Sequence, residues 1–384
     1  MIRISTFILV ISLFSSFTEG QTVSTFLTGS GLNGPDGFTI DTTGNLIVAN
    51  WGGGSGTTVL KITPDASVIV IDSTSDAPDG LAFDSAGYLY ISDYNSGKIT
   101  RTSPAGVKTD FATGLNHPSA LAFDNEWNLY VSNYGGGTVS KITPGGSVSV
   151  FASGFSGPIG LVFDPDGNLY VSNYNTGIVN KVTPNGIVTV FATVPNPSTS
   201  RIQYLARGQS GNLYLPAYGH HKIYKISPAG NVTVLAGTGV SGGKDGPADS
   251  AQFNGPNSIA LTAEGNLFVS EYNANRIRLI TGVEFPVGIK DRGPSPSSGF
   301  ILEKNFPNPF RDRTYLFVHA FRPGSILIQI ITSRGDAAGC IERSVSEGDH
   351  LIPVDNFGLS GGICYATLWS EGRCWGTLRL LVRP

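Results

Sequence analysis

The segment Gly160-Leu161-Val162-Phe163-Asp164-Pro165-Asp166-Gly167-Asn168-Leu169-Tyr170-Val171-Ser172-Asn173-Tyr174 decides the fold, because variants of it occur six times along the chain. The leucine of its Asn-Leu-Tyr step recurs after gaps of 43, 40, 40, 44 and 54 residues, at Leu46, Leu89, Leu129, Leu169, Leu213 and Leu267. A period of about 40 residues with several short strands in each repeat is typical of the blades of a β-propeller. We therefore predict an all-β protein whose main domain is a six-bladed β-propeller.

The strand pattern of single repeats also predicts how the ring of blades closes. In the third repeat, short β-rich stretches bounded by Gly, Pro or Asn predict strands at 120–124, 128–134, 138–143 and 147–152. The sixth repeat lacks the fourth of these stretches, whereas residues 22–28 match the fourth-strand pattern of residues 147–153. We expect the N-terminal strand to complete the last blade, which removes an open sheet edge.

Composition and the beginning of the chain point to an exported protein. Residues 1–20 combine a positive start, an apolar run from Thr6 to Phe17 and a small residue before Gln21, the pattern of a secretory signal peptide. The alternative, a membrane anchor, requires a longer apolar run, and no other stretch predicts a transmembrane segment. The net charge is −3 and no basic patch is interleaved with aromatics, so we expect no nucleic-acid binding.

Residues 21–285 resemble NHL-type repeats and the related gluconolactonase (regucalcin-like) propellers. The resemblance is carried by Lys244-Asp245-Gly246, by residues 251–256 and by Asn275-Arg276-Ile277-Arg278. The Lys141-Ile142-Thr143-Pro144 type of strand also resembles streptogramin-lyase-like propellers, although the catalytic His and Glu of that family have no identifiable counterpart. One propeller scaffold hosts many activities, so these resemblances predict the fold and leave the function open.

One residue at the start of the first strand of each repeat is expected beside the central channel. By alignment these are Asp36, Asp79, Ser119, Ile159, Gln203 and Asn257. Ring closure would make Asn257, Asp36 and Asp79 a contiguous polar arc, which suits a hard cation such as Ca²⁺. In gluconolactonase-like enzymes, the Asp of a Pro-Asp-Gly step and the Asn of a Pro-Asn step are metal ligands, and the Asp also acts as general base. That resemblance implies Asp79 as a catalytic base and Asp36, Asp79 and Asn257 as ligands of Ca²⁺ or another divalent cation. The family's N-terminal glutamate ligand has no equivalent here, and the alternative role for these aspartates is to cap the turn into the strand.

The second strand of each repeat ends in a polar residue followed by an aromatic one. The aromatic residues are Trp51, Tyr94, Tyr134, Tyr174, Tyr218 and Tyr272. They could form a ligand-stacking rim, but their presence in all six repeats favours packing between blades. Among the polar residues before them, Asp93 and Glu271 are candidate binding residues, although support of the following turn is the simpler role.

The fifth repeat departs from the others and adds further candidate binding residues. Arg207 replaces an apolar residue, Gly208 replaces the usual Asp, and the following loop carries His220-His221. The chain before this repeat is lengthened through Pro195-Asn196-Pro197. Local departures from a repeat often mark function, so we include Gln203, Arg207 and His220 in the predicted binding face.

A second domain follows a predicted flexible Pro/Ser/Gly linker at residues 286–300. Residues 301–384 predict a small Ig-like β-sandwich. Pro307-Asn308-Pro309-Phe310 and the step from Leu359 to Tyr365 resemble the C-terminal sorting domain of type IX secretion in Bacteroidetes-like bacteria. The alternative is a generic Ig-like adhesive module. The three cysteines, at 340, 364 and 374, allow one disulfide and a spare thiol, or three thiols.

Two functions follow from these patterns. The first is a secreted or outer-surface propeller that binds a small molecule, glycan or protein on its channel face and reaches the surface through the type IX secretion machinery. The second is a metal-dependent hydrolase of lactones or esters.

Overall fold

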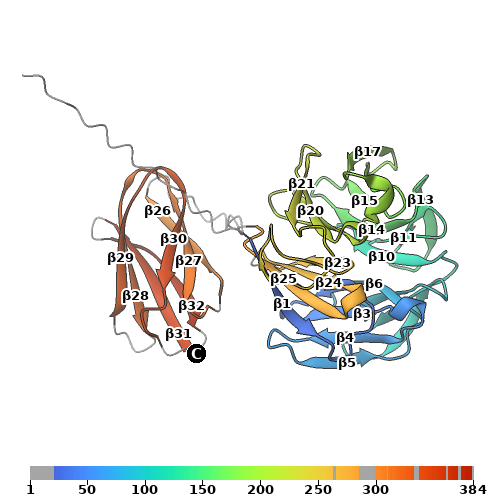
Figure 1. Ribbon diagram of the computed structural model, residues 1–384, viewed down its shortest axis with the longest axis horizontal. Coiled ribbons are helices and arrows are strands. Elements are labelled where there is room, and N and C mark those ends of the chain that lie inside the picture. The colour runs from blue at the N-terminus through green and yellow to red at the C-terminus, as the bar shows by residue number, and fades with distance from the viewer. Residues whose placement is uncertain are drawn as a thin grey trace, which may run out of the picture. The chain divides into compact units, whose positions relative to one another are not determined.

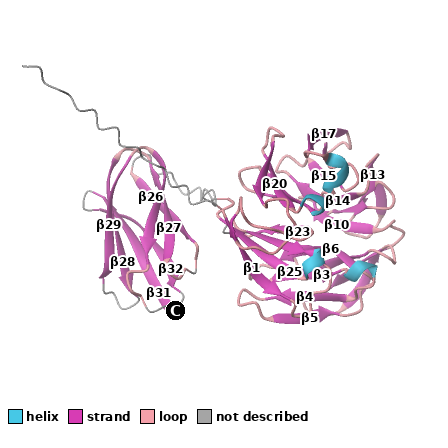
Figure 2. Ribbon diagram, viewed as in Figure 1, coloured by secondary structure: helices cyan, strands magenta, loops and turns pink. Residues whose placement is uncertain are grey.

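The computed structural model describes residues 21–262, 265–284, 299–308, 310–332, 337–359, 362–370 and 373–382. The chain divides into two compact units between Val283 and Glu284. The predicted signal peptide at 1–20 and nearly all of the predicted linker lie outside the described residues. Strands dominate both units, which confirms the all-β class (Figure 2). In the described part of the chain, no helix has the length and apolar character needed to span a membrane.

The described part of the first unit forms six antiparallel sheets, as expected from six repeats. The first three sheets consist of β2 (Pro35–Ile40), β3 (Leu46–Asn50), β4 (Thr58–Ile62) and β5 (Val68–Asp72); β6 (Pro78–Phe83), β7 (Leu89–Asp93), β8 (Lys98–Thr102) and β9 (Lys108–Ala112); and β10 (Pro118–Phe123), β11 (Leu129–Asn133), β12 (Thr138–Ile142) and β13 (Val148–Ser153). The next two consist of β14 (Pro158–Phe163), β15 (Leu169–Asn173), β16 (Ile178–Val182) and β17 (Val188–Thr193); and β18 (Ala206–Arg207), β19 (Leu213–Ala217), β20 (Lys222–Ile226) and β21 (Val232–Ala236).

The last sheet is built from both ends of the unit. It contains β22 (Gly246–Pro247), β1 (Thr22–Thr28), β25 (Arg276–Thr281), β24 (Leu267–Glu271) and β23 (Pro256–Leu261), in that order. β1 pairs antiparallel with β25, from Thr22 opposite Thr281 to Thr28 opposite Arg276, and Figure 1 shows the blue β1 beside β25. The predicted pairing of residues 22–28 with the last repeat is therefore present. The short helices are α1 (Pro197–Ser200), η1 (Gly52–Gly54), η2 (Tyr218–His220) and η3 (Tyr272–Ala274).

The first strands of the sheets follow one another in a closed circuit. β2 contacts β6, β6 contacts β10, and the series continues through β14, β18 and β23 back to β2. Glycine permits this close approach, because a Cβ on Gly37 would clash with the backbone oxygen of Asp79 and a Cβ on Gly80 with that of Ser119. The second strand of each four-stranded sheet is fully buried on both faces. These sheets are consistent with a β-propeller.

A bulge in the first strand frees the channel-side residue from the sheet. Pro35 pairs with Asn50, but the next paired residue is Phe38, opposite Val48, so Asp36 and Gly37 leave the ladder. The same shift occurs in β6, β10, β14 and β23. A bulge redirects side chains that would otherwise alternate across the sheet.

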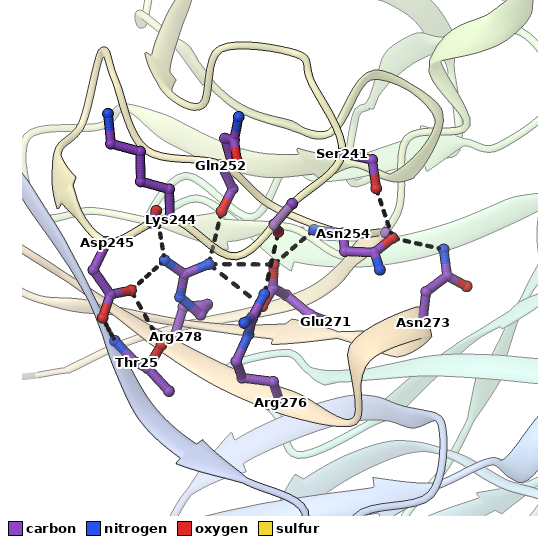
Figure 3. A network of polar contacts seen from close by, with 12 residues as sticks. Thr25, Ser241, Lys244, Asp245, Gln252, Asn254, Glu271, Asn273, Arg276 and Arg278 are labelled. Atoms are coloured by element: carbon purple, nitrogen blue, oxygen red, sulfur yellow. Dashed lines mark hydrogen bonds and ion pairs between the residues drawn. The ribbon is translucent and has the colours of Figure 1, made fainter.

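A polar network ties the N-terminal strand to the last sheet (Figure 3). Thr25 donates its backbone N–H to Asp245 at 3.0 Å, and Arg278 contacts the same carboxylate at 2.6 Å. The side chains of Arg278 and Glu271 are fully buried, and the Arg278 Nη1–Glu271 Oε1 distance is 3.4 Å. Each of the two has a second partner of opposite charge, Asp245 for Arg278 and Arg276 for Glu271, and removing one charge from such a buried network is destabilising.

The second unit contains two antiparallel sheets with a common core. One consists of β26 (Phe300–Phe306), β27 (Arg313–Ala320) and β30 (Gly348–Asp355). The other consists of β29 (Ala337–Val345), β28 (Gly324–Thr332), β31 (Gly362–Ser370) and β32 (Arg373–Val382). Alternate residues such as Ile326, Ile328 and Ile330 are buried, as expected for strands with one covered face. Cys340 is exposed and Cys364 is buried, and both are free thiols.

Candidate functional site

A cavity of about 240 Å³ lies where the first strands of the sheets meet. The structure brings all six residues predicted at the channel to its wall: Asp36, Asp79, Ser119, Ile159, Gln203 and Asn257. All except Asp36 are buried. We call these six residues the floor.

The floor residues are held by hydrogen bonds between neighbouring sheets. The Ser92 hydroxyl donates to the Ser119 carbonyl oxygen at 2.7 Å, and the Ser132 hydroxyl donates to that of Ile159 at 2.6 Å. Ser172 makes the same contact with Gln203. These serines come from the repeated Ser step of the second strand, so the second, third and fourth sheets each hold the floor residue of the next sheet. The sequence pattern contained this signal, which our prediction did not use.

Asp36 and Asp79 form a hydrogen-bonded carboxyl pair on the floor. Burial raises the pKa of Asp79 to about 6, although hydrogen bonds from Tyr204, Ser119 and Asp36 partly offset the increase. Burial, followed by the negative charge of Asp79, raises the pKa of Asp36 well above its usual range. Asp36 is therefore the protonated partner, and the two carboxyls share one proton near neutral pH.

Tyr204 reaches this pair from the segment that precedes β18. Its hydroxyl donates to Asp79 Oδ1, and burial together with the two neighbouring carboxyls keeps its pKa well above the usual value. Asn257 is hydrogen-bonded to Asp36 on the other side. The floor thus offers both hydrogen-bond donors and acceptors to a ligand.

The six predicted aromatic residues also line the cavity, and all six are half-buried. We call them the aromatic rim. Trp51 contacts Tyr94 and Tyr272 with ring centroids 5.8 and 6.0 Å apart, and further contacts join Tyr94 to Tyr134, Tyr134 to Tyr174, and Tyr218 to Tyr272. The rings therefore pack between sheets, as predicted, and they also present surface to the cavity. No ring contact joins Tyr174 to Tyr218 among the described residues.

Arg201 lines the cavity at this gap, and sequence reasoning missed it. Burial raises the pKa of Tyr174, but the charge of Arg201 and a hydrogen bond from its side chain partly offset the increase. The lengthened chain before the fifth repeat was the available signal. It was hard to use because Ile202 stands where all the other repeats have proline, and Arg201 stands where four of them have glycine or alanine.

Four predicted binding residues do not line this cavity. Asp93 accepts a hydrogen bond from the backbone N–H of Asp76 at 2.9 Å and another from the Thr100 hydroxyl at 3.1 Å. Glu271 accepts the backbone N–H of Asn254 at 2.7 Å and pairs with arginines (Figure 3).

The other two belong to the fifth sheet. Arg207 is the last residue of β18 and lies opposite Leu213 of β19 in the antiparallel ladder. His220 bridges the Thr199 hydroxyl at 3.1 Å and the Tyr224 hydroxyl at 3.0 Å. All four residues therefore support loops, turns or strand ends in this structure.

The floor offers a partial set of ligands for a divalent cation. Asp36, Asp79 and Asn257 supply carboxylate and amide oxygens, the donor type that Ca²⁺ prefers. Among the described residues, however, no group of three or more His, Cys, Asp or Glu side chains is placed to hold a metal. A cation at this position would displace the proton that the carboxyls share and would need further oxygens from water or from a ligand.

Comparison with known proteins supports a propeller of this type. The model of the virginiamycin B lyase family matches residues 65–281. A catalytically inactive His-to-Ala variant of virginiamycin B lyase from Staphylococcus aureus, solved with quinupristin, is 18% identical; the match covers 77% of this chain and 95% of that chain, with a TM-score of 0.52.

Two further solved structures have the same fold with different described roles. An auxiliary nutrient binding protein from Bacteroides thetaiotaomicron is 16% identical, with 69% of this chain and 77% of that chain covered and a TM-score of 0.59. A gluconolactonase from Xanthomonas campestris is 17% identical, with 67% and 88% covered and a TM-score of 0.54. No curated protein matches the sequence. At these identities the solved structures establish the fold alone, which is a β-propeller.

Proposed function

This chain belongs to the virginiamycin B lyase family, and from that premise we propose that it binds a small ring-containing molecule in its central cavity. The observation that carries the proposal is the combination of an aromatic rim with a polar floor in one cavity. Half-buried aromatic faces stack on the apolar face of a ring, while a few convergent polar groups fix its orientation. The solved nutrient-binding propeller shows that this fold is compatible with a binding role.

The shared proton gives the floor a specific hydrogen-bonding character. A lone carboxylate only accepts hydrogen bonds, whereas Asp36 and Asp79 together contain one acidic proton. With Ser119, Gln203 and Asn257 beside them, they match a ligand whose hydroxyl groups both donate and accept. Such a ligand is a sugar or another polyhydroxylated ring.

A ligand panel on the full chain tests this proposal. Neutral monosaccharides, uronic acids, aryl glycosides and aromatic acids would be measured by isothermal calorimetry and thermal shift. We expect at least one class to bind and Trp51→Ala to weaken it about fivefold or more, since loss of an aromatic contact is typically worth above about 1 kcal/mol. Trp127→Ala is the matched control, because Trp127 is absent from the cavity wall. Failure of the entire panel to bind would refute the proposal.

A second candidate function is hydrolysis of a lactone or ester. It is favoured by the pKa of Asp79, which at about 6 suits a general base working near neutral pH. In this function Asp36, Asp79 and Asn257 would hold a divalent cation, which lowers the pKa of a bound water. Asp79 would accept the proton of the attacking water, and Tyr204 would orient the Asp79 carboxylate.

Calcium calorimetry on the wild type and on Asp79→Ala, followed by a lactone and aryl-ester panel, tests the hydrolase function. Absence of heat and of stabilisation at millimolar Ca²⁺ would remove it. In the catalytically inactive variant of virginiamycin B lyase a histidine is replaced by alanine, whereas no histidine lines this cavity among the described residues. His117 comes near, stacked on Tyr94 with ring centroids 4.6 Å apart, so the lyase activity is the third choice.

The proposal also covers the arrangement of the sheets in each unit and the route by which the protein is exported. We infer that the six sheets are the blades of one propeller, that the two sheets of the second unit form an Ig-like sandwich, and that residues 301–384 direct type IX secretion to the outer surface. The supporting features are the circuit of first strands, the two-sheet core and the motifs around Pro307 and Gly362. Deletion of residues 301–384 should trap the protein in the periplasm, and normal surface delivery of the truncation would refute this assignment.

A further inference from the structure

Two positions before each floor residue, the chain adopts a left-handed backbone. These residues, with φ between 47° and 65°, are Gly34, Ala77, His117, Gly157, Arg201 and Gly255. Most of their carbonyls accept the N–H of a rim aromatic, as in Tyr134 to His117 at 3.0 Å and Tyr218 to Arg201 at 3.2 Å. The conformation is natural for glycine and unfavourable for a residue with a long side chain. Arg201 and His117 are therefore exceptions that the surrounding structure has to enforce.

The lengthened segment before the fifth sheet holds Arg201 in this conformation. α1 ends at Ser200, directly before Arg201, and the Thr199 hydroxyl contacts His220 Nε2 at 3.1 Å. A Cβ on Gly219 would clash with the Thr199 carbonyl oxygen, so α1 is packed tightly against η2. His220 thus acts on the cavity indirectly, as a positioning residue for the turn that presents Arg201.

Arg201 supplies the cation of the cavity. Among the residues that line it, the carboxyl groups are those of the floor residues Asp36 and Asp79, which already bond to each other. No ion pair involving Arg201 is found among the described residues, and its side chain is exposed at the gap in the aromatic rim. A guanidinium at such a place binds a carboxylate through two parallel hydrogen bonds.

Resting on the proposed binding function, we infer that Arg201 makes the cavity selective for a sugar ring that bears a carboxylate. The carboxylate binds Arg201, the apolar face of the ring stacks on the aromatic rim, and the hydroxyls bond to the floor. A backbone held in an unfavourable conformation at a cavity wall is typical of a functional position. With a neutral ligand the guanidinium charge would be used only in the contact with Tyr174, and glycine occupies this position in three other sheets.

Isothermal calorimetry with matched sugars tests the inference on the full chain. Galacturonate and glucuronate would be compared with galactose and glucose. We expect the uronates to bind about tenfold or more tightly than their neutral counterparts, since a hydrogen bond to a charged group contributes about 1.5–3 kcal/mol. Added salt should reduce the preference.

Arg201→Gly separates binding from folding, because Gly34, Gly157 and Gly255 occupy the same position in other sheets. The variant should bind uronates and their neutral counterparts with equal affinity and melt no earlier than the wild type. Ala66→Gly is the matched control: it also relieves a positive φ, of 66°, and lies outside the cavity wall. It should leave the preference unchanged.

The possible failures are distinct. Equal affinity for uronates and neutral sugars, or an Arg201→Gly variant that keeps the preference, overturns this inference and leaves the proposed function intact. Binding of the aromatic acids alone overturns the sugar class. Absence of binding by every compound in the wider panel overturns the proposed function as well.

Discussion

The shared proton on the cavity floor should make the stability of the first unit depend on pH. In the unfolded chain Asp79 ionises near its ordinary pKa of 3.8, whereas in the fold its pKa is about 6. Between these two pKa values the folded state binds more protons than the unfolded chain. The contribution of Asp79 to the free energy of unfolding is therefore fully present below pH 3.8 and is lost as the pH rises through 6. The pKa of Asp36 is also raised, so it acts in the same direction.

The magnitude follows from the same pKa. Each pH unit between the unfolded and folded pKa is worth about 1.4 kcal/mol, so Asp79 alone contributes about 3 kcal/mol. The double variant Asp36→Asn, Asp79→Asn keeps the shape of the pair and removes its titration. We expect the unfolding free energy of the wild type, measured relative to this variant, to fall by about 3 kcal/mol or more between pH 4 and pH 7.

Denaturant unfolding of both proteins at several pH values measures the difference in their unfolding free energies. The second unit is the same in both proteins, so its own pH dependence cancels. Asp41→Asn provides a control of opposite sign. Burial opposes ionisation of Asp41, but hydrogen bonds from Asn45 and Thr43 lower its pKa to about 2, so it stabilises the fold above its unfolded pKa. If the difference in unfolding free energy between the wild type and the double variant does not change from pH 4 to 7, the two carboxyls ionise as they do in the unfolded chain. The floor would then not hold a shared proton.

Three further predictions concern the framework. Arg278→Met should cost about 3–5 kcal/mol in unfolding free energy, because it removes a fully buried cation from Glu271 and also removes the hydrogen bonds that Arg278 donates to the Gln252 and Lys244 carbonyls. Arg313→Met, at an exposed pair with Asp355, should cost below about 1 kcal/mol, and equal thermal shifts would contradict this. Gly37→Ala should destabilise the protein strongly through its clash with the Asp79 backbone, while Gly145→Ala, in ordinary contact only, should be nearly neutral in the same melt. Deletion of residues 21–28 should leave β25 as an open edge and promote aggregation, and a truncation that stays monodisperse by light scattering would refute that role.

The sequence predicted the repeating part of the fold well because the same physical pattern recurs. Strands bounded by glycine, proline and asparagine appear in each repeat, and the N-terminal match to a fourth strand predicted the pairing of Thr22–Thr28 with β25. Alignment of the repeats also placed all six floor residues correctly beside one cavity. Periodicity is a strong signal when each unit repeats the same contacts.

The features that depend on distance and burial could not be predicted in this way. The proton shared by Asp36 and Asp79 requires two carboxyls from different sheets to lie in contact and out of water. Arg201 lies in an insertion that breaks the repeat and lacks the usual proline after it. His220 belongs to the predicted binding face, but its contacts with Thr199 and Tyr224 give it a supporting position, and it does not line the cavity.

The structure explains how a nearly uniform repeat can carry a specific site. In three sheets a glycine at this position, Gly37, Gly80 or Gly160, allows neighbouring first strands to touch, and the residue before it, released from the ladder by the bulge, lines the cavity. Its side chain makes no cross-strand pair, so its identity changes from Asp to Ser, Ile, Gln or Asn between sheets while the strand is preserved. The same holds at the left-handed position, where glycine, alanine, histidine and arginine all occur. Ligand specificity can therefore change through these two positions in each sheet without disturbing the packing that builds the propeller.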